Sequence, residues 1–167
     1  RSFTINTVAE TGEYVYTSCT DTTTSAAITR FAHWYKGRYD WKCYLQSAGV
    51  GGEYFLEWLD WEDFKFLYRK GTQVSSQPTH VSVDPSLKFV LGPKPSAVYV
   101  VTGDYQMSPQ TLAADADIPE MPSRFHALIT YRAMVKYGFN SVATEVLQRA
   151  SVEGGRIQAA LVRDQRP

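Results

Sequence analysis

The chain has 167 residues, of which 44% are hydrophobic and 20% are charged. This length fits one domain at about 150 residues per domain, and the composition excludes a disordered tail, a collagen and a coiled-coil rod. The 17 basic and 17 acidic residues give a net charge of zero. A dedicated nucleic-acid-binding module usually carries a basic excess, so that class is disfavoured. No apolar run approaches the roughly 20 residues of a membrane span, so no membrane partner is expected.

The aromatic share is high, at 14%, with 11 Tyr and 4 Trp. Most single aromatic residues pack in cores and sheets, but Tyr and Trp are also favoured at binding interfaces and against sugars. One open alternative is therefore a carbohydrate- or receptor-binding β-domain of a virion or cell-surface protein. The helical pattern that begins near Ser123 argues against it.

Residues 1–106 are typical of an antiparallel β region made of hairpins and a meander. In segment 39–46 apolar or aromatic side chains alternate with mostly polar ones. This period of two predicts a strand with one face on the core and the other toward water. The pair Gly37-Arg38 fits a type II′ turn, which would join this strand to segment 28–36 as a hairpin. The members of the core face are Tyr39, Trp41, Cys43 and Leu45. Segment 19–25 is interpreted as a polar loop.

One short helix is predicted within the β region, over residues 61–70. Asp60 precedes it as a capping residue, acidic residues occupy its first turn, and Gly71 ends it. The side chains expected on its buried face are Phe64, Leu67 and Tyr68. Three strands follow, over 79–83, 87–91 and 98–105, separated by proline-containing turns that predict an antiparallel meander.

A linker over 107–122 leads into a helical region over 123–163. Ser123 is placed to cap a helix that ends at Gly138, and the next helix is expected to be interrupted or kinked at Gly154-Gly155. The fold class is therefore α+β: an antiparallel β-sheet region with one short helix, followed by a helical hairpin. All of residues 1–167 are expected to form a single domain.

No pattern in the sequence calls for an enzyme. Nucleophile elbows, phosphate loops and dinucleotide fingerprints are missing, and no Cys–His spacing fits zinc. Cys19 and Cys43 are expected to be reduced and partly buried. Asp115 and Asp117 are interpreted as solvated loop and capping residues, and a hydrolase that uses one of them is a further alternative. No catalytic, cofactor-binding or metal-binding residue is therefore predicted, and no cofactor.

Several segments in a fixed order resemble one known family. His33-Trp34 and Tyr39-Asp40-Trp41 come first, followed by Leu91-Gly92-Pro93-Lys94-Pro95 and Gly103-Asp104-Tyr105. The most specific segment, PEMPSRFH over 119–126, comes just before the first helix of the hairpin. This order is similar to that of the head-to-tail connector (adaptor) proteins of tailed bacteriophages, over about residues 29–165.

The resemblance implies a structural, non-enzymatic virion protein, a subunit of a ring between the portal and the tail through which the genome passes. Such rings commonly hold about a dozen copies with cyclic symmetry, so a dodecamer is the expected assembly. The implied partners are the portal protein, a tail or stopper/terminator protein and further copies of the chain, with DNA only as the passing genome. The implied location is the head–tail neck of the virion, and the host cytoplasm during assembly.

The resemblance also implies two surfaces. In this family a C-terminal segment often docks onto the portal, and the residues at that location are Arg156, Ile157, Leu161, Arg163 and Arg166. A channel that lets DNA slide should not be strongly basic, because released counterions would hold the DNA in place. The acidic residues proposed to face such a channel are Glu53, Glu57, Asp60 and Glu62.

Overall fold

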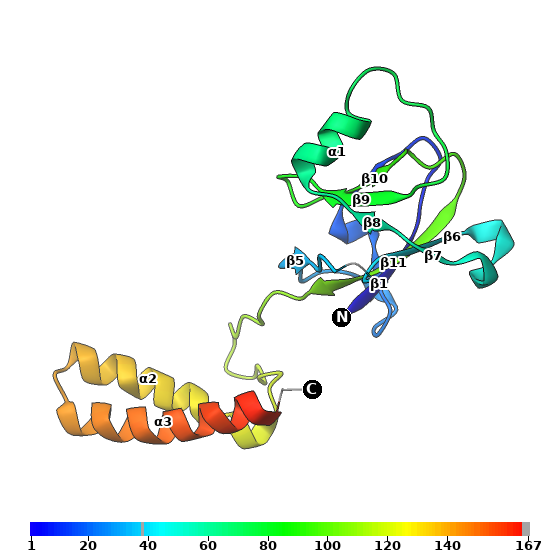
Figure 1. Ribbon diagram of the computed structural model, residues 1–167. Helices are drawn as coiled ribbons and strands as arrows, with labels where there is room; N and C mark the ends of the chain where they lie inside the picture. The colour runs from blue at the N-terminus through cyan, green and yellow to red at the C-terminus, as the bar shows by residue number, and fades with distance from the viewer. Residues whose placement is uncertain (38, 165–167) are drawn as a thin grey trace. The chain divides into compact units, whose positions relative to one another are not determined.

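The computed structural model describes residues 1–37 and 39–164 (Figure 1). The chain forms two compact units, Arg1–Pro109 and Gln110–Pro167. The first unit holds the antiparallel strands and one short helix, and the second holds two helices. The predicted α+β class, with a β-rich region followed by a helical hairpin, is therefore confirmed. The single connector domain over residues 1–167 stays a prediction.

The larger sheet of the β-rich unit has seven strands and is organised around β11. On one side β11 pairs antiparallel with β1, with Phe3 opposite Gly103, and β5 and β6 also pair with it. Strands β3 and β4 continue the sheet beyond β1, and β7 continues it beyond β6. Its members are β1 (Ser2–Asn6), β3 (Thr20–Asp21), β4 (Ala26–Ala27), β5 (His33–Trp34), β6 (Lys42–Leu45), β7 (Tyr54–Phe55) and β11 (Tyr99–Gln106).

The smaller sheet has the order β2-β10-β9-β8, and only its β8–β9 pair is parallel. Its members are β2 (Glu13–Tyr14), β8 (Glu57–Trp58), β9 (His80–Val83) and β10 (Phe89–Gly92). Between β7 and β8 lies the buried Leu56, where the chain passes from the larger sheet to the smaller one. Short 3-10 turns occur at Tyr16–Ser18, Gln46–Ala48 and Val50–Gly52 in this unit.

The predicted hairpin of segments 28–36 and 39–46 is wrong. Strands β5 and β6, which lie in these segments, pair with β11 and not with each other. The reason is that Trp34 and Trp41 both enter the core, and the Trp41 indole N–H donates to the Tyr35 carbonyl, 2.8 Å away. The period of two still places Trp41 correctly. The predicted turn includes Arg38, which lies outside the described residues.

The predicted meander is correct only for its first two strands. β9 and β10 form an antiparallel pair, whereas β11 belongs to the other sheet. Pro93 and Pro95 lie between β10 and β11 and cannot donate backbone hydrogen bonds to a ladder. The Pro95 carbonyl instead accepts from Glu10 N–H, and the Lys94 carbonyl accepts from Ser76 N–H. This segment therefore leads the chain away from the smaller sheet.

The core of the β-rich unit is a cluster of aromatic rings. Trp41 lies between Phe3 and Phe89, with ring centroids 5.2 Å away in each case, and Trp34 is 5.6 Å from Trp41. Gly103 makes room for them, since a Cβ there would lie 2.8 Å from Phe3 and 3.2 Å from Trp41. Large apolar area with tilted and edge-on ring contacts is the arrangement that aromatic side chains favour.

Segment 19–25 was interpreted as a polar loop, and this is wrong at two positions. Cys19 and Asp21 are both buried, and β3 lies inside the segment. The Asp21 carboxylate accepts hydrogen bonds from the Tyr105 hydroxyl and from the backbone N–H groups of Thr23 and Thr24. These hydrogen bonds offset the cost of burying the charged carboxylate. A local sequence pattern could not predict them, because Tyr105 is distant in the sequence.

Helix α1 (Trp61–Tyr68) begins where the sequence predicts and ends two residues earlier than predicted. Asp60 precedes it, but its side chain makes no capping hydrogen bond. Phe64 is buried and its ring meets that of Tyr68 at a tilted angle, with a centroid distance of 5.0 Å, whereas Leu67 is 48% exposed. A helix of two turns buries only a narrow stripe, so Leu67 falls outside it.

The second unit is a hairpin of α2 (Ala127–Asn140) and α3 (Thr144–Asp164), preceded by a 3-10 turn at Ser123–Phe125. The expected interruption at Gly154-Gly155 is wrong, because α3 continues through both residues. Gly154 permits close packing of the two helices, since a Cβ there would lie 3.2 Å from Tyr131 Cβ. Gly138 has the same role against Leu147, at 3.0 Å.

The substitution Gly154→Leu should destabilise the hairpin by about 1–3 kcal/mol, because overpacking forces the helices apart. Leucine at Gly155 is the matched control, since a Cβ there meets nothing within 4 Å. It should be neutral or stabilising by up to about 1 kcal/mol through its helix propensity. Urea unfolding followed by circular dichroism at the helix band measures both, and equal effects would contradict the close-packing role of Gly154.

Candidate functional site

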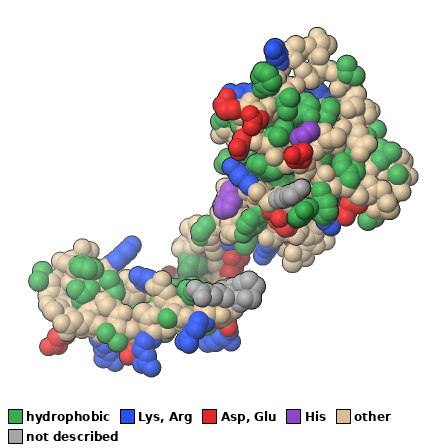
Figure 2. Space-filling view, viewed as in Figure 1, with side chains coloured by type: hydrophobic (Ala, Val, Ile, Leu, Met, Phe, Trp, Pro, Cys, Tyr) green, Lys and Arg blue, Asp and Glu red, His purple; other side chains and the backbone are tan. Residues whose placement is uncertain are grey.

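The helical unit carries an apolar groove with arginines around it. The groove has a volume of about 640 Å³, and its lining is Arg124, Phe125, Glu153, Arg156, Ile157, Ala159, Ala160 and Arg163. Figure 2 shows Lys and Arg side chains along the part of this unit that α3 forms in Figure 1. A second shallow hollow, lined partly by Ala159, Val162 and Arg163, continues the apolar surface along α3.

The groove is built from two segments that the hairpin brings together. The 3-10 turn before α2 supplies Arg124 and Phe125, and the guanidinium of Arg124 lies 4.9 Å from the Phe125 ring centre. Arg124 also forms an ion pair with Asp164 near the end of α3. On α3, Arg156 lies 3.6 Å from Glu153. These contacts fix the turn against the end of α3 and leave the apolar floor open.

The structure divides the residues predicted to meet the portal. Arg156, Ile157 and Arg163 line the groove. Leu161 is not among the lining residues, and its helical spacing places it on the face of Ala150, which packs on α2. Arg166 lies outside the described residues. The sequence reasoning missed Arg124 and Phe125 as groove residues, although an antiparallel hairpin places the start of its first helix beside the end of its second.

The acidic residues predicted to face a channel lie around β7, β8 and α1, and most have a basic neighbour. Glu53 lies 3.1 Å from Lys42, Glu62 lies 2.8 Å from Lys65, and Glu57 lies 3.5 Å from His80. Asp60 directly precedes α1. Figure 2 shows acidic side chains on the β-rich unit where Figure 1 places α1. Lys42 and Lys65 reduce the local negative field, since nearby opposite charges offset each other.

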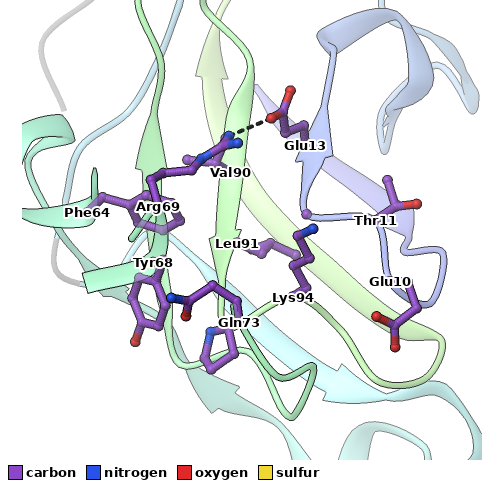
Figure 3. A pocket seen from close by; sticks show the side chains of 12 residues that line it. Glu10, Thr11, Glu13, Phe64, Tyr68, Arg69, Gln73, Val90, Leu91 and Lys94 are labelled. Atoms are coloured by element: carbon purple, nitrogen blue, oxygen red, sulfur yellow. Dashed lines mark hydrogen bonds and ion pairs between the residues drawn. The ribbon is translucent and has the colours of Figure 1, made fainter. Parts of the chain in front are cut away.

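A smaller pocket of about 340 Å³ opens between β2, β10 and α1 (Figure 3). Phe64, Tyr68 and Leu91 contribute apolar surface to it, and an ion pair between Arg69 and Glu13 lies at its rim. The hydrogen bond from Arg69 lowers the pKa of Glu13, against an opposing effect of burial. Because Glu13 stays ionised and paired, the pocket suits an apolar group better than acid–base chemistry.

Exposed aromatic side chains also line a hollow on the β-rich unit. Tyr39 is 62% exposed and meets Phe55 edge-on, at a centroid distance of 5.2 Å. Lys36 lies 5.6 Å from the Trp58 ring centre, and Lys42 lies 5.7 Å from that of Phe55. Sugars stack on flat, open ring faces, and these lysines cover part of two of them. The hollow therefore gives the carbohydrate-binding alternative limited support.

The two cysteine side chains are poorly placed to act as nucleophiles. Both cysteines are free and buried, and desolvation raises the pKa of Cys19 to about 12 and that of Cys43 to about 11. Thiols with such pKa values stay protonated and are weak nucleophiles. Among residues 1–37 and 39–164, no group of three or more His, Cys, Asp or Glu side chains could hold a metal ion. Nor does this part of the chain contain a helix long and apolar enough to cross a bilayer.

These features define an α+β protein with a partly apolar hollow on each of its two units. A family model described as "SU10 adaptor protein" matches residues 3–166, and the chain belongs to this family of phage head–tail adaptors. A search of curated proteins gives no match. The resemblance stated from the sequence is therefore confirmed, and the chain is a structural component of a phage virion that interacts with other head or tail proteins.

Proposed function

We propose that the chain is a non-enzymatic ring subunit between the portal and the tail of a tailed phage, and that the genome passes through this ring. The observation that carries the proposal is the family match over residues 3–166. A head-to-tail cyclic ring needs two different contact faces on each subunit. About a dozen copies is the expected number for such a ring. The second axial partner is a tail or stopper/terminator protein.

The apolar groove of the helical unit, the α3 groove, is the proposed contact with the portal protein. Its apolar lining is flanked by arginines, and Arg is among the residues enriched where proteins bind each other. Ile157, Ala159 and Ala160 supply the apolar surface beside the buried Phe125, and Arg156 and Arg163 lie at its rim. Truncating the chain from Arg156 would also remove packing against α2, so point substitutions are the sharper test.

The acidic side chains around α1 are proposed to face the DNA channel. The side chains of Glu57 and Glu62 are 74% and 81% exposed, so both can contribute negative charge to a surface. A channel without basic excess does not retain DNA by counterion release. A density map of the assembled ring tests this placement, and Glu57 and Glu62 on its outer surface would overturn it.

Mass photometry of the purified chain, with and without the portal protein of the same phage, tests the proposed function. We expect a high-order species only when portal is added, because the portal ring would act as the template for assembly. A chain that ignores portal and stays monomeric would contradict the proposal. A titration with glycans, followed by tryptophan fluorescence, would then test the carbohydrate-binding alternative.

A further inference from the structure

The side chains that line the α3 groove carry a net positive charge. Its lining contains three arginines and one acidic residue, Glu153. Arg124 is held by Asp164 and by the Phe125 ring. Among the described residues Arg163 makes no ion pair, and Arg156 has only a 3.6 Å contact with Glu153, its side chain being 76% exposed. Arg156 and Arg163 are therefore the two guanidinium groups available to a partner.

The apolar floor and the arginines together restrict the chemistry of that partner. Nucleic acid would satisfy the guanidinium groups but would leave Ile157 and Ala159 without apolar contacts, and Glu153 and Asp164 would repel its phosphates. A purely apolar segment would bury the floor and leave the arginines unpaired. A segment with carboxylates beside an apolar stripe satisfies both features.

The spacing of Arg156 and Arg163 restricts the conformation of the partner segment. Arg156 and Arg163 are seven residues apart on α3, which is about 10 Å along the helix axis. Two carboxylates on another helix reach this separation at positions i and i+7, with apolar residues at i+3 and i+4 facing the groove. In a strand, about 10 Å separates positions i and i+3, and the side chains at these two positions point to opposite faces. A helix therefore presents both carboxylates to one side, and a strand does not.

We propose that the α3 groove binds an acidic amphipathic helix of the portal protein, with two carboxylates two turns apart that pair with Arg156 and Arg163. This inference rests on the proposed function and specifies the partner's chemistry at the same site. The apolar stripe of that helix packs on Ile157, Ala159 and Ala160. Charged groups at the rim and apolar contacts in the centre are the usual anatomy of such an interface.

Portal binding by full-length variants tests the inference. Charge reversal (R156E with R163E) and filling of the groove (A159W) should each weaken binding at least about tenfold, whereas R156K with R163K should retain most of it. The matched control is R149E, an exposed arginine of α3 outside the groove, and it should bind like the unmodified chain. Circular dichroism checks that each variant keeps its helices.

Two results separate this inference from the proposed function. If portal binds all variants equally, the α3 groove is not its site and the inference is wrong, while the connector function stands. If the unmodified chain does not bind portal, the connector function fails. The inference on groove chemistry is then judged with a labelled helical peptide of about 18 residues carrying Glu at i and i+7, against the same peptide with Lys. Binding of the Glu peptide alone supports it, and equal binding or none overturns it.

Discussion

Replacing Trp41 with alanine should lower the free energy of unfolding of the β-rich unit by about 4 kcal/mol, the largest effect expected for a single substitution here. Trp41 is fully buried and its ring contacts Phe3, Trp34 and Phe89. Its removal leaves a cavity at the centre of the cluster and the Tyr35 carbonyl without its indole donor. Urea unfolding followed by far-ultraviolet circular dichroism measures the change.

Phe66→Ala is the matched control for this prediction, because the Phe66 side chain is 70% exposed. Its effect should stay within about 0.5 kcal/mol, as for most surface substitutions. Trp41→Phe keeps part of the ring area and should cost less than Trp41→Ala, so a folded variant remains measurable if the alanine variant does not fold. Equal losses for Phe66→Ala and Trp41→Ala would show that the aromatic cluster is not the main source of stability.

Replacing Asp21 with asparagine should cost about 3 kcal/mol at neutral pH, because a buried, hydrogen-bonded charge is removed. Three of its partners are donors that point at carboxylate oxygens: the Tyr105 hydroxyl and the N–H groups of Thr23 and Thr24. Arg1 adds an ion pair at 3.2 Å. An asparagine amide brings N–H donors of its own into this site, so at least one buried donor loses its acceptor.

The same carboxylate makes stability depend on pH. Burial alone would raise the pKa of Asp21, but the hydrogen bonds from Tyr105, Thr24, Thr23 and Arg1 outweigh it and hold this pKa well below its ordinary value. The stabilisation is therefore fully present above the pKa of the unfolded chain, about 4, and is lost as the pH falls through the folded value. We expect the free energy of unfolding to drop below about pH 4, and to drop less steeply in Asp21→Asn.

Urea unfolding at several pH values between about 2 and 7 checks this pair of expectations. Tyr105→Phe is the companion variant, since it removes one donor and keeps the charge. It should destabilise the protein less than Asp21→Asn and retain most of the acid-induced loss. Equal acid sensitivity in Asp21→Asn and the unmodified chain would assign the effect to other carboxylates.

The groove shows how far sequence reasoning could reach toward the site. The family resemblance implies a partner surface that includes Arg156, Ile157 and Arg163, and the structure puts these three residues in one groove. Leu161 belongs to the same helix, but its spacing turns it toward α2. Arg124 was not predicted as a groove residue, because its ion pair with Asp164 joins residues 40 positions apart, and nothing local in the sequence records that contact.

The sequence by itself determined the local elements. Alternation placed Trp41 and Cys43 on a buried face, the acidic first turn after Asp60 predicted α1, and the apolar spacing after Ser123 predicted two helices. These signals are local, because they depend on the period of a strand or a helix. The family was also readable from the order of its motifs, as the match over residues 3–166 confirms.

Only the tertiary structure decided which strands pair and which charges are buried. β5 and β6 both pair with β11, across more than 50 residues of chain, because Trp34 in β5 and Trp41 directly before β6 share one core. Asp21 became an interior charge because Tyr105, distant in sequence, donates to it. Strand partners and buried ion partners are chosen by packing between distant segments, and a local pattern is compatible with several such choices.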